Sequence, residues 1–281
     1  MHIFEQTGPL EEYLNSCREV NRSVALVPTM GGLHQGHLKL IDKAKECSEI
    51  VVVSVFVNPT QFAENEDFEA YPKTLSEDKE ILEAMEVEVM FVPLDNQIYP
   101  NGKLQDYDVG RIGKILCGIS RPIHFNGVAQ VVSRLFDIVK PNYAVFGEKD
   151  YQQLLIIKSL VERKDLKTTI VSVPTVRESD GLAMSTRNNY LSSQERANAA
   201  LFYQQLVAIK LAIQSGTKIS SAIDQAVDAL NAIFEVEYIE VLNAKNLTQI
   251  TTSSCEIIII SAVRLGETRL IDNIVFRRSD V

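Results

Sequence analysis

Apolar and polar positions alternate in blocks along the chain up to about residue 176, and these blocks predict strands followed by helices. Residues 50–58, IVVVSVFVN, form an uninterrupted apolar run, which is typical of a strand buried on both faces of a parallel sheet. Residues 38–47 precede this run and show helical spacing, with apolar side chains on one side. The other predicted strands lie at 24–27, 88–92, 143–147 and 168–173, and the other predicted helices lie around 74–85, 128–139 and 151–163.

Strands that alternate with helices are typical of βαβ units, so we expect an α/β fold with a Rossmann-like, doubly wound parallel sheet. In such a sheet, ligands bind at the carboxyl ends of the strands.

After about residue 176 the pattern changes. SSQE at 192–195 is a capping-box pattern that opens an amphipathic helix through about residue 214. A second helix at 220–234 follows, and then strands at 236–242, 256–263 and 268–276 without further alternation. This order predicts a smaller C-terminal α+β domain. We therefore expect one domain in residues 1–176 and a second in residues 177–281.

The composition limits the classes of partner. The net charge of −9 and the sequence pI of about 5.1 argue against sequence-independent binding of nucleic acid, which needs a basic surface. The four cysteines are scattered without a C-x-x-C pair, and we expect reduced thiols in a cytoplasmic protein without a secretory leader. The longest apolar runs have the length of strands and are far shorter than a membrane span, so we expect no membrane anchor.

Two of the four histidines, His34 and His37, lie three residues apart where a predicted strand gives way to a helix, in the segment PTMGGLHQGHLKLIDKA. A zinc site needs at least a third ligand, and the chain contains no H-E-x-x-H motif. The pair could also consist of ordinary surface or core histidines. The functional interpretation depends on position: a helix start directly after a parallel strand presents free backbone N–H groups and the positive end of the helix dipole to an anion.

Glycines around the histidines favour the anion interpretation. Gly31 and Gly32 allow a ligand to approach the backbone closely, and Gly36 leaves space between the imidazoles. Both imidazoles can then donate to phosphate oxygens while charge develops at an α-phosphate. The segment matches neither the Walker A pattern nor G-x-G-x-x-G. The sequence therefore predicts phosphate chemistry of another type.

Further blocks along the chain resemble a known family. TMGGLHQGH is similar to the nucleotide-binding signature of the HxGH nucleotidyltransferase superfamily, which includes class I aminoacyl-tRNA synthetases. The other blocks are VSVFVNPTQF, YPKTL, RPIHFNGVAQVV, VFGEKDYQQL and VPTVRESDGLAMSTRNNYLS. Together they resemble the pantothenate synthetase (pantoate–β-alanine ligase) family over about residues 24–192. Beyond about residue 200 the resemblance lies mainly in the plan of helices and strands.

The resemblance implies an ATP-dependent ligase that condenses (R)-pantoate with β-alanine to pantothenate. Pantoate would attack the α-phosphate of ATP, with Mg²⁺ as the cofactor that accompanies ATP, to give pantoyl adenylate and pyrophosphate. The amine of β-alanine would then displace AMP. Residues 1–176 would bind ATP and pantoate, residues 177–281 would form a lid domain, and the enzyme would be a homodimer.

The resemblance also implies roles for individual residues. It implies catalytic roles for His37, His34 and Lys149, and contacts with pantoate or β-alanine for Gln61 and Gln153. The ATP-binding residues that it implies are Met30, Gly31, Gly32, Leu33, His34, Gln35, Gly36, His37, Gly147, Glu148, Lys149, Asp150, Val176, Met184, Ser185, Thr186 and Arg187. The metal ligands stay open, as do the roles of Lys73, Asp78, Arg121 and His124.

Without the resemblance, the same blocks have simpler interpretations. NPTQF would be a Pro-Thr turn, GEKD an ordinary charged turn and AMSTRN a flexible hinge. Two other functions also remain to be distinguished: a nucleotidyltransferase that acts on a phosphorylated small molecule, and a non-catalytic ATP-binding module. The NPTQF and GEKDYQQ blocks argue against the first. The joint presence of His34, His37, Lys149 and Arg187 argues against the second.

Overall fold

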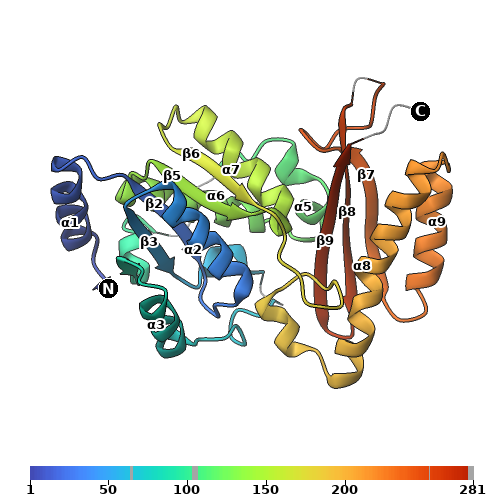
Figure 1. Cartoon of the computed structure of the whole chain (residues 1–281), viewed down its shortest axis with the longest axis horizontal. Helices are drawn as coiled ribbons and strands as arrows, with labels where there is room; N and C mark the ends of the chain where they lie inside the picture. Colours follow the sequence, from blue (N-terminus) through green and yellow to red (C-terminus); the bar gives the residue numbers. More distant parts are fainter. Residues whose placement is uncertain (64–65, 103–106, 253, 278–281) are drawn as a thin grey trace. The chain divides into compact units, whose positions relative to one another are not determined.

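The computed structural model describes residues 1–63, 66–102, 107–252 and 254–277, and the chain forms two compact units (Figure 1). The N-terminal unit comprises Met1–Glu148 and Gln152–Pro174. The C-terminal unit comprises Thr175–Val281 together with the short segment Lys149–Tyr151. Each unit is described by itself below.

The N-terminal unit is built on a six-stranded sheet with the strand order β1-β4-β3-β2-β5-β6, in which every pair is parallel. Its strands are β1 (His2–Phe4), β2 (Val24–Thr29), β3 (Ile50–Val55), β4 (Val89–Phe91), β5 (Tyr143–Gly147) and β6 (Thr169–Val173). From β2 the chain proceeds to β3 on one side, whereas β5 lies on the other side. The strand order therefore reverses between β2 and β5, and the carboxyl ends of these two strands mark the expected ligand position.

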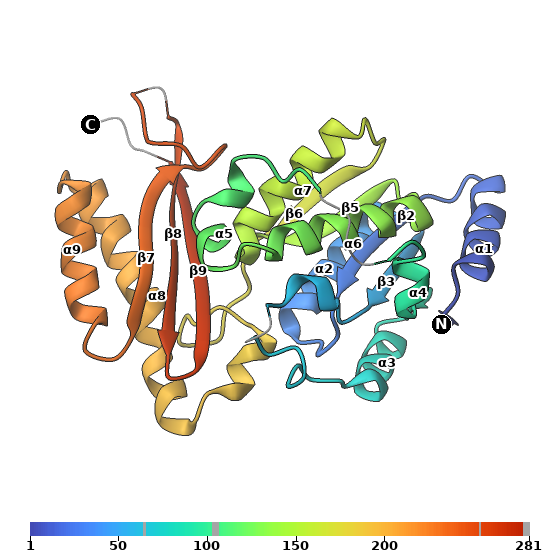
Figure 2. The same ribbon diagram turned by 180° about the vertical axis from the view of Figure 1, so that it is seen from behind.

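Helices cover both faces of this sheet. Neighbouring residues of a strand point to opposite faces, so each strand contributes side chains to two apolar cores. The helices are α1 (Thr7–Glu19), α2 (Gln35–Cys47), α3 (Leu75–Ala84), α4 (Asp95–Ile98), α5 (Cys117–Ser120), α6 (His124–Val139) and α7 (Tyr151–Arg163). Leu26 and Val52 belong to the core shared with α1, α6 and α7, whereas Val27 and Val53 belong to the core shared with α2 and α3. Figure 2 shows the same layers from behind. Single 3₁₀ turns are η1 (Pro59–Gln61), η2 (Ile112–Lys114) and η3 (Glu148–Asp150).

The C-terminal unit packs two helices on an antiparallel sheet. After the 3₁₀ turn η4 (Thr186–Tyr190), the chain forms α8 (Ser193–Gln214), α9 (Ile219–Leu230), β7 (Glu235–Asn243), β8 (Glu256–Leu265) and β9 (Thr268–Arg277). The strand order is β7-β8-β9. Side chains such as Phe202 of α8 and Leu230 of α9 share one apolar core with Ile259 of β8.

The α/β fold with a smaller C-terminal α+β part is confirmed, and α7 spans the helix expected at 151–163. Ser192 caps α8 through its side chain, as the SSQE pattern predicts. The sequence did not predict β1, α1 or the single-turn helices α4 and α5, and α6 begins at His124, four residues before the expected helix. None of the helices in the described ranges is long and apolar enough to span a membrane.

Candidate active site

The loop after β2 turns sharply at two glycines. Gly31 and Gly32 have φ angles of +84° and +63°, a region that side chains with a Cβ rarely adopt. A Cβ at Gly31 would also lie 2.8 Å from a carboxylate oxygen of Asp78. The sequence GG is therefore needed both for the backbone conformation and for the close approach of this carboxylate.

Asp78 of α3 holds this loop in place. Its two carboxylate oxygens accept hydrogen bonds from the backbone N–H groups of Gly32 (3.0 Å) and Leu33 (2.8 Å), and the Thr74 hydroxyl donates to it at 3.2 Å. The Asp78 residue is only 1% exposed. Sequence reasoning left Asp78 without a role because an acidic residue in the first turn of a helix is common, and the contact spans more than forty positions of the chain.

His34 and His37 cap α2 with their own imidazoles. His34 has extended backbone angles at the N-cap, and its Nδ1 accepts from the N–H of Gly36 at 3.1 Å. The Nδ1 of His37 accepts from the N–H of His34 at 3.3 Å, and the two ring centroids are 4.1 Å apart. Because each Nδ1 acts as an acceptor, the proton of each neutral ring lies on Nε2. The capping contacts therefore make both Nε2 atoms hydrogen-bond donors.

The expectation of free backbone N–H groups at the start of this helix is wrong for His34 and Gly36, whose N–H groups donate to an imidazole Nδ1. In the loop before the helix, the N–H groups of Gly32 and Leu33 donate to Asp78. The reason is that this chain supplies its own acceptors for these donors. An anion at this position would thus meet imidazole Nε2–H donors.

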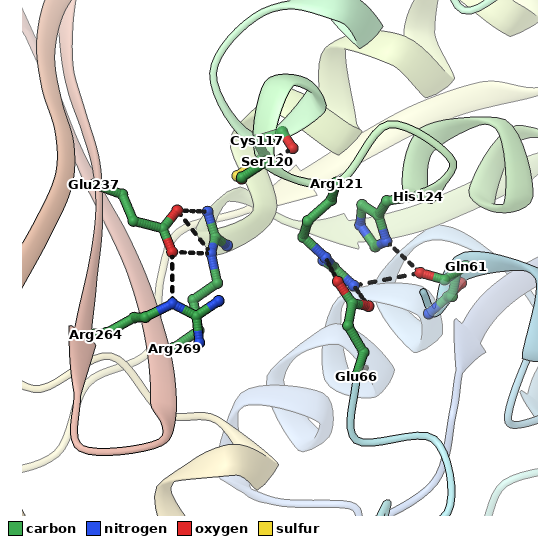
Figure 3. Close-up of polar contacts among 9 residues, drawn as sticks. All are labelled: Gln61, Glu66, Cys117, Ser120, Arg121, His124, Glu237, Arg264 and Arg269. Atoms are coloured by element: carbon green, nitrogen blue, oxygen red, sulfur yellow. Dashed lines mark hydrogen bonds and ion pairs between the residues drawn. The ribbon is translucent and has the colours of Figure 1, made fainter. Parts of the chain in front are cut away.

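The side chain of Gln61 in η1 is buried and held at both ends of its amide. Its Nε2 contacts the sulfur of Met30, and its Oε1 accepts from Asn58 at 3.2 Å. The backbone carbonyl oxygen of Gln61 contacts Arg121 Nη2 at 3.3 Å and His124 Nδ1 at 2.9 Å (Figure 3). The structure therefore joins Gln61 to the loop after β2.

Arg121 is itself held by Glu66 in a two-point ion pair, with N–O distances of 2.5 and 2.6 Å (Figure 3). Burial acts to raise the pKa of the Glu66 carboxyl, but the hydrogen bonds and charge of Arg121 outweigh burial, so this pKa is lowered. Arg121 and His124, which the sequence left without a role, thus support the backbone of the Gln61 turn.

Asn58 connects the Gln61 turn to α6. Its Nδ2 donates to the carbonyl of Gly127 at 3.1 Å, while its Oδ1 accepts from the N–H of Thr60 at 3.2 Å and from the hydroxyl of Tyr99. A Cβ at Gly127 would lie 2.3 Å from the Thr60 carbonyl oxygen, so only glycine permits this approach. Burial raises the pKa of Tyr99 to about 12.

The two glutamines at the start of α7 differ in their surroundings. Gln152 is buried, and its Nε2 donates to the carbonyls of Ile112 (2.7 Å) and Ile115 (2.8 Å) while its Oε1 accepts from the N–H of Cys117. Gln152 therefore fixes the segment around η2. Gln153 is half-buried on the same helix, and its contact with pantoate stays a prediction.

The GEKD block begins at the carboxyl end of β5, as expected for a ligand-binding edge. Within the N-terminal unit, the Glu148 carboxylate accepts from the Ser172 hydroxyl of β6 at 2.8 Å. Lys149 and Asp150 belong to the C-terminal unit, where their charged groups are 3.7 Å apart.

The AMSTRN block follows a hairpin in the C-terminal unit. The N–H of Met184 donates to the carbonyl of Val176 at 3.0 Å, and Arg177 and Ala183 form an isolated antiparallel bridge. Ser185 caps η4, since its hydroxyl accepts from the N–H of Arg187 at 3.3 Å. Arg187 thus lies in a turn that is fixed by its own serine, rather than in an irregular hinge.

The candidate residues therefore fall into two groups. His34, His37 and Gln61 belong to the N-terminal unit, and Lys149 and Arg187 belong to the C-terminal unit. In the part of the chain that the structure describes, no group of three or more His, Cys, Asp or Glu side chains could hold a metal ion.

Comparisons with known proteins agree with the resemblance found in the sequence. A family model described as Pantoate-beta-alanine ligase matches residues 2–275. A pantothenate synthetase of Vesicomyosocius okutanii is 50% identical over 280 residues, which cover 100% of this chain and 99% of the relative.

Solved structures give the same result. The chain is similar to a crystal structure of pantothenate synthetase from Thermus thermophilus, with a TM-score of 0.91, 39% identity and coverage of 98% of this chain and 99% of the other. It is also similar to a pantoate–β-alanine ligase from Francisella tularensis, described as complexed with β-γ ATP and β-alanine. There the TM-score is 0.83, the identity is 36%, and the coverage is 98% and 97%.

Proposed function

Because the chain belongs to the pantoate–β-alanine ligase family of enzymes, we propose that it condenses (R)-pantoate with β-alanine at the expense of ATP. Pantoyl adenylate is the intermediate, and pyrophosphate and AMP are released. Within the molecule, the observation that carries the proposal is the imidazole pair at the start of α2, whose Nδ1 contacts fix both Nε2 atoms as donors.

In the first step, a carboxylate oxygen of pantoate attacks the α-phosphorus of ATP, and the bond to pyrophosphate breaks. Negative charge grows on the α-phosphate oxygens, where the Nε2–H groups of His34 and His37 donate. Donors that are already oriented need no reorganisation as this charge develops, and one such donor typically contributes about 10²–10³ in rate. Lys149 and Arg187 bind the β- and γ-phosphates and stabilise the leaving pyrophosphate.

Gln61 and Gln153 orient the carboxylate of pantoate. An amide donates without a net charge, so it can position the attacking oxygen without lowering its nucleophilicity as a bidentate arginine would. The Gln61 Nε2 has a second N–H besides the one that contacts Met30. The contacts that hold the Gln61 backbone, from Arg121 and His124, keep this donor in one place.

The remaining contacts with ATP follow the family resemblance. The backbone of Met30–His37 and of Gly147–Asp150 surrounds the nucleotide, Val176 contacts the adenine, and Met184–Arg187 contacts the phosphates. Mg²⁺ supplies charge neutralisation on the phosphates, and Asp150 is the carboxylate that would hold it. Residues 1–176 bind ATP and pantoate, and residues 177–281 act as a lid domain that excludes water from the acyl adenylate.

The enzyme is a cytoplasmic homodimer in this proposal. The four cysteines carry thiols rather than disulfides, which supports a reducing compartment. A dimer would give twice the 31.4 kDa chain mass in sedimentation equilibrium.

Isotope exchange tests the proposed reaction. An enzyme that forms an acyl adenylate exchanges labelled pyrophosphate into ATP only when pantoate is present, and it does so without β-alanine. A nucleotidyltransferase for a phosphorylated substrate would show no exchange with pantoate, and a non-catalytic ATP-binding module would show none under any condition. Either result would refute the proposal.

A further inference from the structure

Two neighbouring polar residues, Asp272 and Asn273, lie in the middle of β9, where apolar residues would be expected. They pair with Ser261 and Ile260 of β8, and they are only 2% and 6% exposed. Asp272 lies between Leu270 and Ile274, both of which pack into the apolar core under the helices. A carboxylate at such a position is costly unless it is paired, so its presence calls for a partner.

That partner is Arg177. Its two terminal nitrogens donate to the Asp272 carboxylate at 2.6 and 2.9 Å, which is a bidentate ion pair. Burial raises the pKa of the Asp272 carboxyl, and the hydrogen bonds and charge of Arg177 oppose this effect. The guanidinium also lies 3.7 Å from the ring centroid of Tyr203 on α8. Arg177 is therefore held by the sheet, through Asp272, and by the helical layer, through Tyr203.

Arg177 in turn holds the hairpin that leads into the AMSTRN block. Its guanidinium donates to the carbonyl of Gly181 at 3.0 Å, and its backbone bridges Ala183 across the hairpin. Gly181 has a φ of +97°, and a Cβ there would lie 2.4 Å from the Tyr203 ring. Only a few residues separate Ala183 from Arg187. The ion pair between Arg177 and Asp272 therefore fixes the position at which the chain enters η4, the turn that carries Arg187.

Asn273 points to the other face of the strand and reaches a different segment. Its Nδ2 donates to the backbone carbonyl of Lys149 at 3.0 Å. Its own N–H donates to a carboxylate oxygen of Asp272 at 2.7 Å, and its carbonyl accepts from Arg177 at 3.3 Å. Two segments that are far apart in the sequence are thus attached to adjacent residues of one strand.

We propose that Asp272 and Asn273 are positioning residues for ATP, which hold the Arg187 turn and the Lys149 segment at a fixed separation so that both cations meet the same polyphosphate. This inference rests on the proposed function, in which Lys149 and Arg187 bind the phosphates. It adds that the C-terminal strand, which contacts no substrate in that scheme, sets the spacing of the two cations.

The first test removes the contact with Lys149. Asn273→Leu keeps the volume of the side chain but has no donor, and Asn273→Ala serves as a second variant if the first fails to fold. We expect the Kd for ATP, measured by calorimetry on the full chain, to rise about tenfold. The KM for pantoate in pyrophosphate exchange should change less than twofold. In a Lys149→Ala background, Asn273→Leu should change the Kd for ATP less than twofold, because its effect acts through Lys149.

The second test neutralises the buried carboxylate. Asp272→Asn should raise the Kd for ATP about tenfold, and this effect should nearly disappear in an Arg187→Ala background. Glu237→Gln is a matched control, because Glu237 of β7 forms a similar two-point ion pair with Arg269 of β9 in the same sheet (Figure 3). The control should bind ATP like the wild type.

The inference would be overturned if the losses of ATP affinity multiplied with those of Lys149→Ala and Arg187→Ala, or if the variants weakened the use of ATP and of pantoate equally. A Kd for ATP like that of the Glu237→Gln control would overturn it as well. The proposed function fails separately, if the wild-type chain binds ATP but shows no exchange with pantoate. A wild-type chain that does not bind ATP refutes both.

Discussion

Replacing Asp78 with asparagine tests whether a buried carboxylate fixes the loop in front of the two histidines. The carboxylate accepts from two backbone N–H groups, those of Gly32 and Leu33, and from the Thr74 hydroxyl. An asparagine amide keeps one acceptor oxygen and presents an NH₂ group at the position of the other. One backbone N–H of the loop would then face a second donor.

The magnitude follows from these contacts. A buried donor left without an acceptor costs about 1–3 kcal/mol, and the remaining hydrogen bonds lose the strength that the charge gives them. We therefore expect Asp78→Asn to lower the free energy of unfolding by about 2–4 kcal/mol. The loop should also relax away from Asp78, and a displacement of His34 by about 1 Å can cost about 10² in rate.

Urea unfolding and pyrophosphate exchange measure the two effects. Glu77→Gln is the matched control, because Glu77 precedes Asp78 in the same helix turn and is exposed. The control should unfold and turn over like the wild type. If Asp78→Asn has the unfolding midpoint and the exchange rate of the control, the carboxylate does not hold the loop and the assignment is wrong.

Three further measurements test other residues of the N-terminal unit. His37→Ala should slow adenylate formation about 10²–10³-fold in single-turnover experiments, and a rate near that of the wild type would exclude its role at the α-phosphate. Gln61→Ala should raise the KM for pantoate strongly while the Kd for ATP changes little, and an unchanged KM would refute the contact. Tyr99 should ionise near pH 12 rather than near pH 10, so the folded state should lose stability as the pH rises from 10 towards 12. An ultraviolet titration of the wild type and Tyr99→Phe checks this, and a Tyr99 step near pH 10 would contradict it.

The parallel sheet could be predicted because its central strands are buried on both faces. Such strands read as uninterrupted apolar runs, and the helices between them have apolar residues at helical spacing. The first helix, α1, was missed although Leu10 and Leu14 are four residues apart. Gly8 and Pro9 lie in its first turn, where a missing N–H donor does no harm, but the same pair in a sequence is typical of a turn.

Without the resemblance, the local geometry of the candidate site could be predicted only where its residues are neighbours in the sequence. His34 and His37 share one helix turn, so their proximity follows from spacing alone. The contacts that hold the site join distant positions, as Asp78 does with Gly32, and no local pattern specifies them. The general rule for helix starts also failed here, because the imidazoles themselves accept the hydrogen bonds that the rule leaves for a ligand.

In the proposed reaction, the carboxylate of pantoate attacks the α-phosphorus of ATP. The most direct measurement uses pantoate labelled with ¹⁸O in its carboxylate, in a complete reaction with ATP and β-alanine, followed by mass spectrometry of the nucleotide product. When the amine displaces AMP from the acyl adenylate, the oxygen that joined the carbonyl carbon to phosphorus leaves with AMP. We expect AMP that carries one ¹⁸O atom. Unlabelled AMP, or label found in inorganic phosphate with ADP as the nucleotide product, would refute the attack of pantoate on the α-phosphorus.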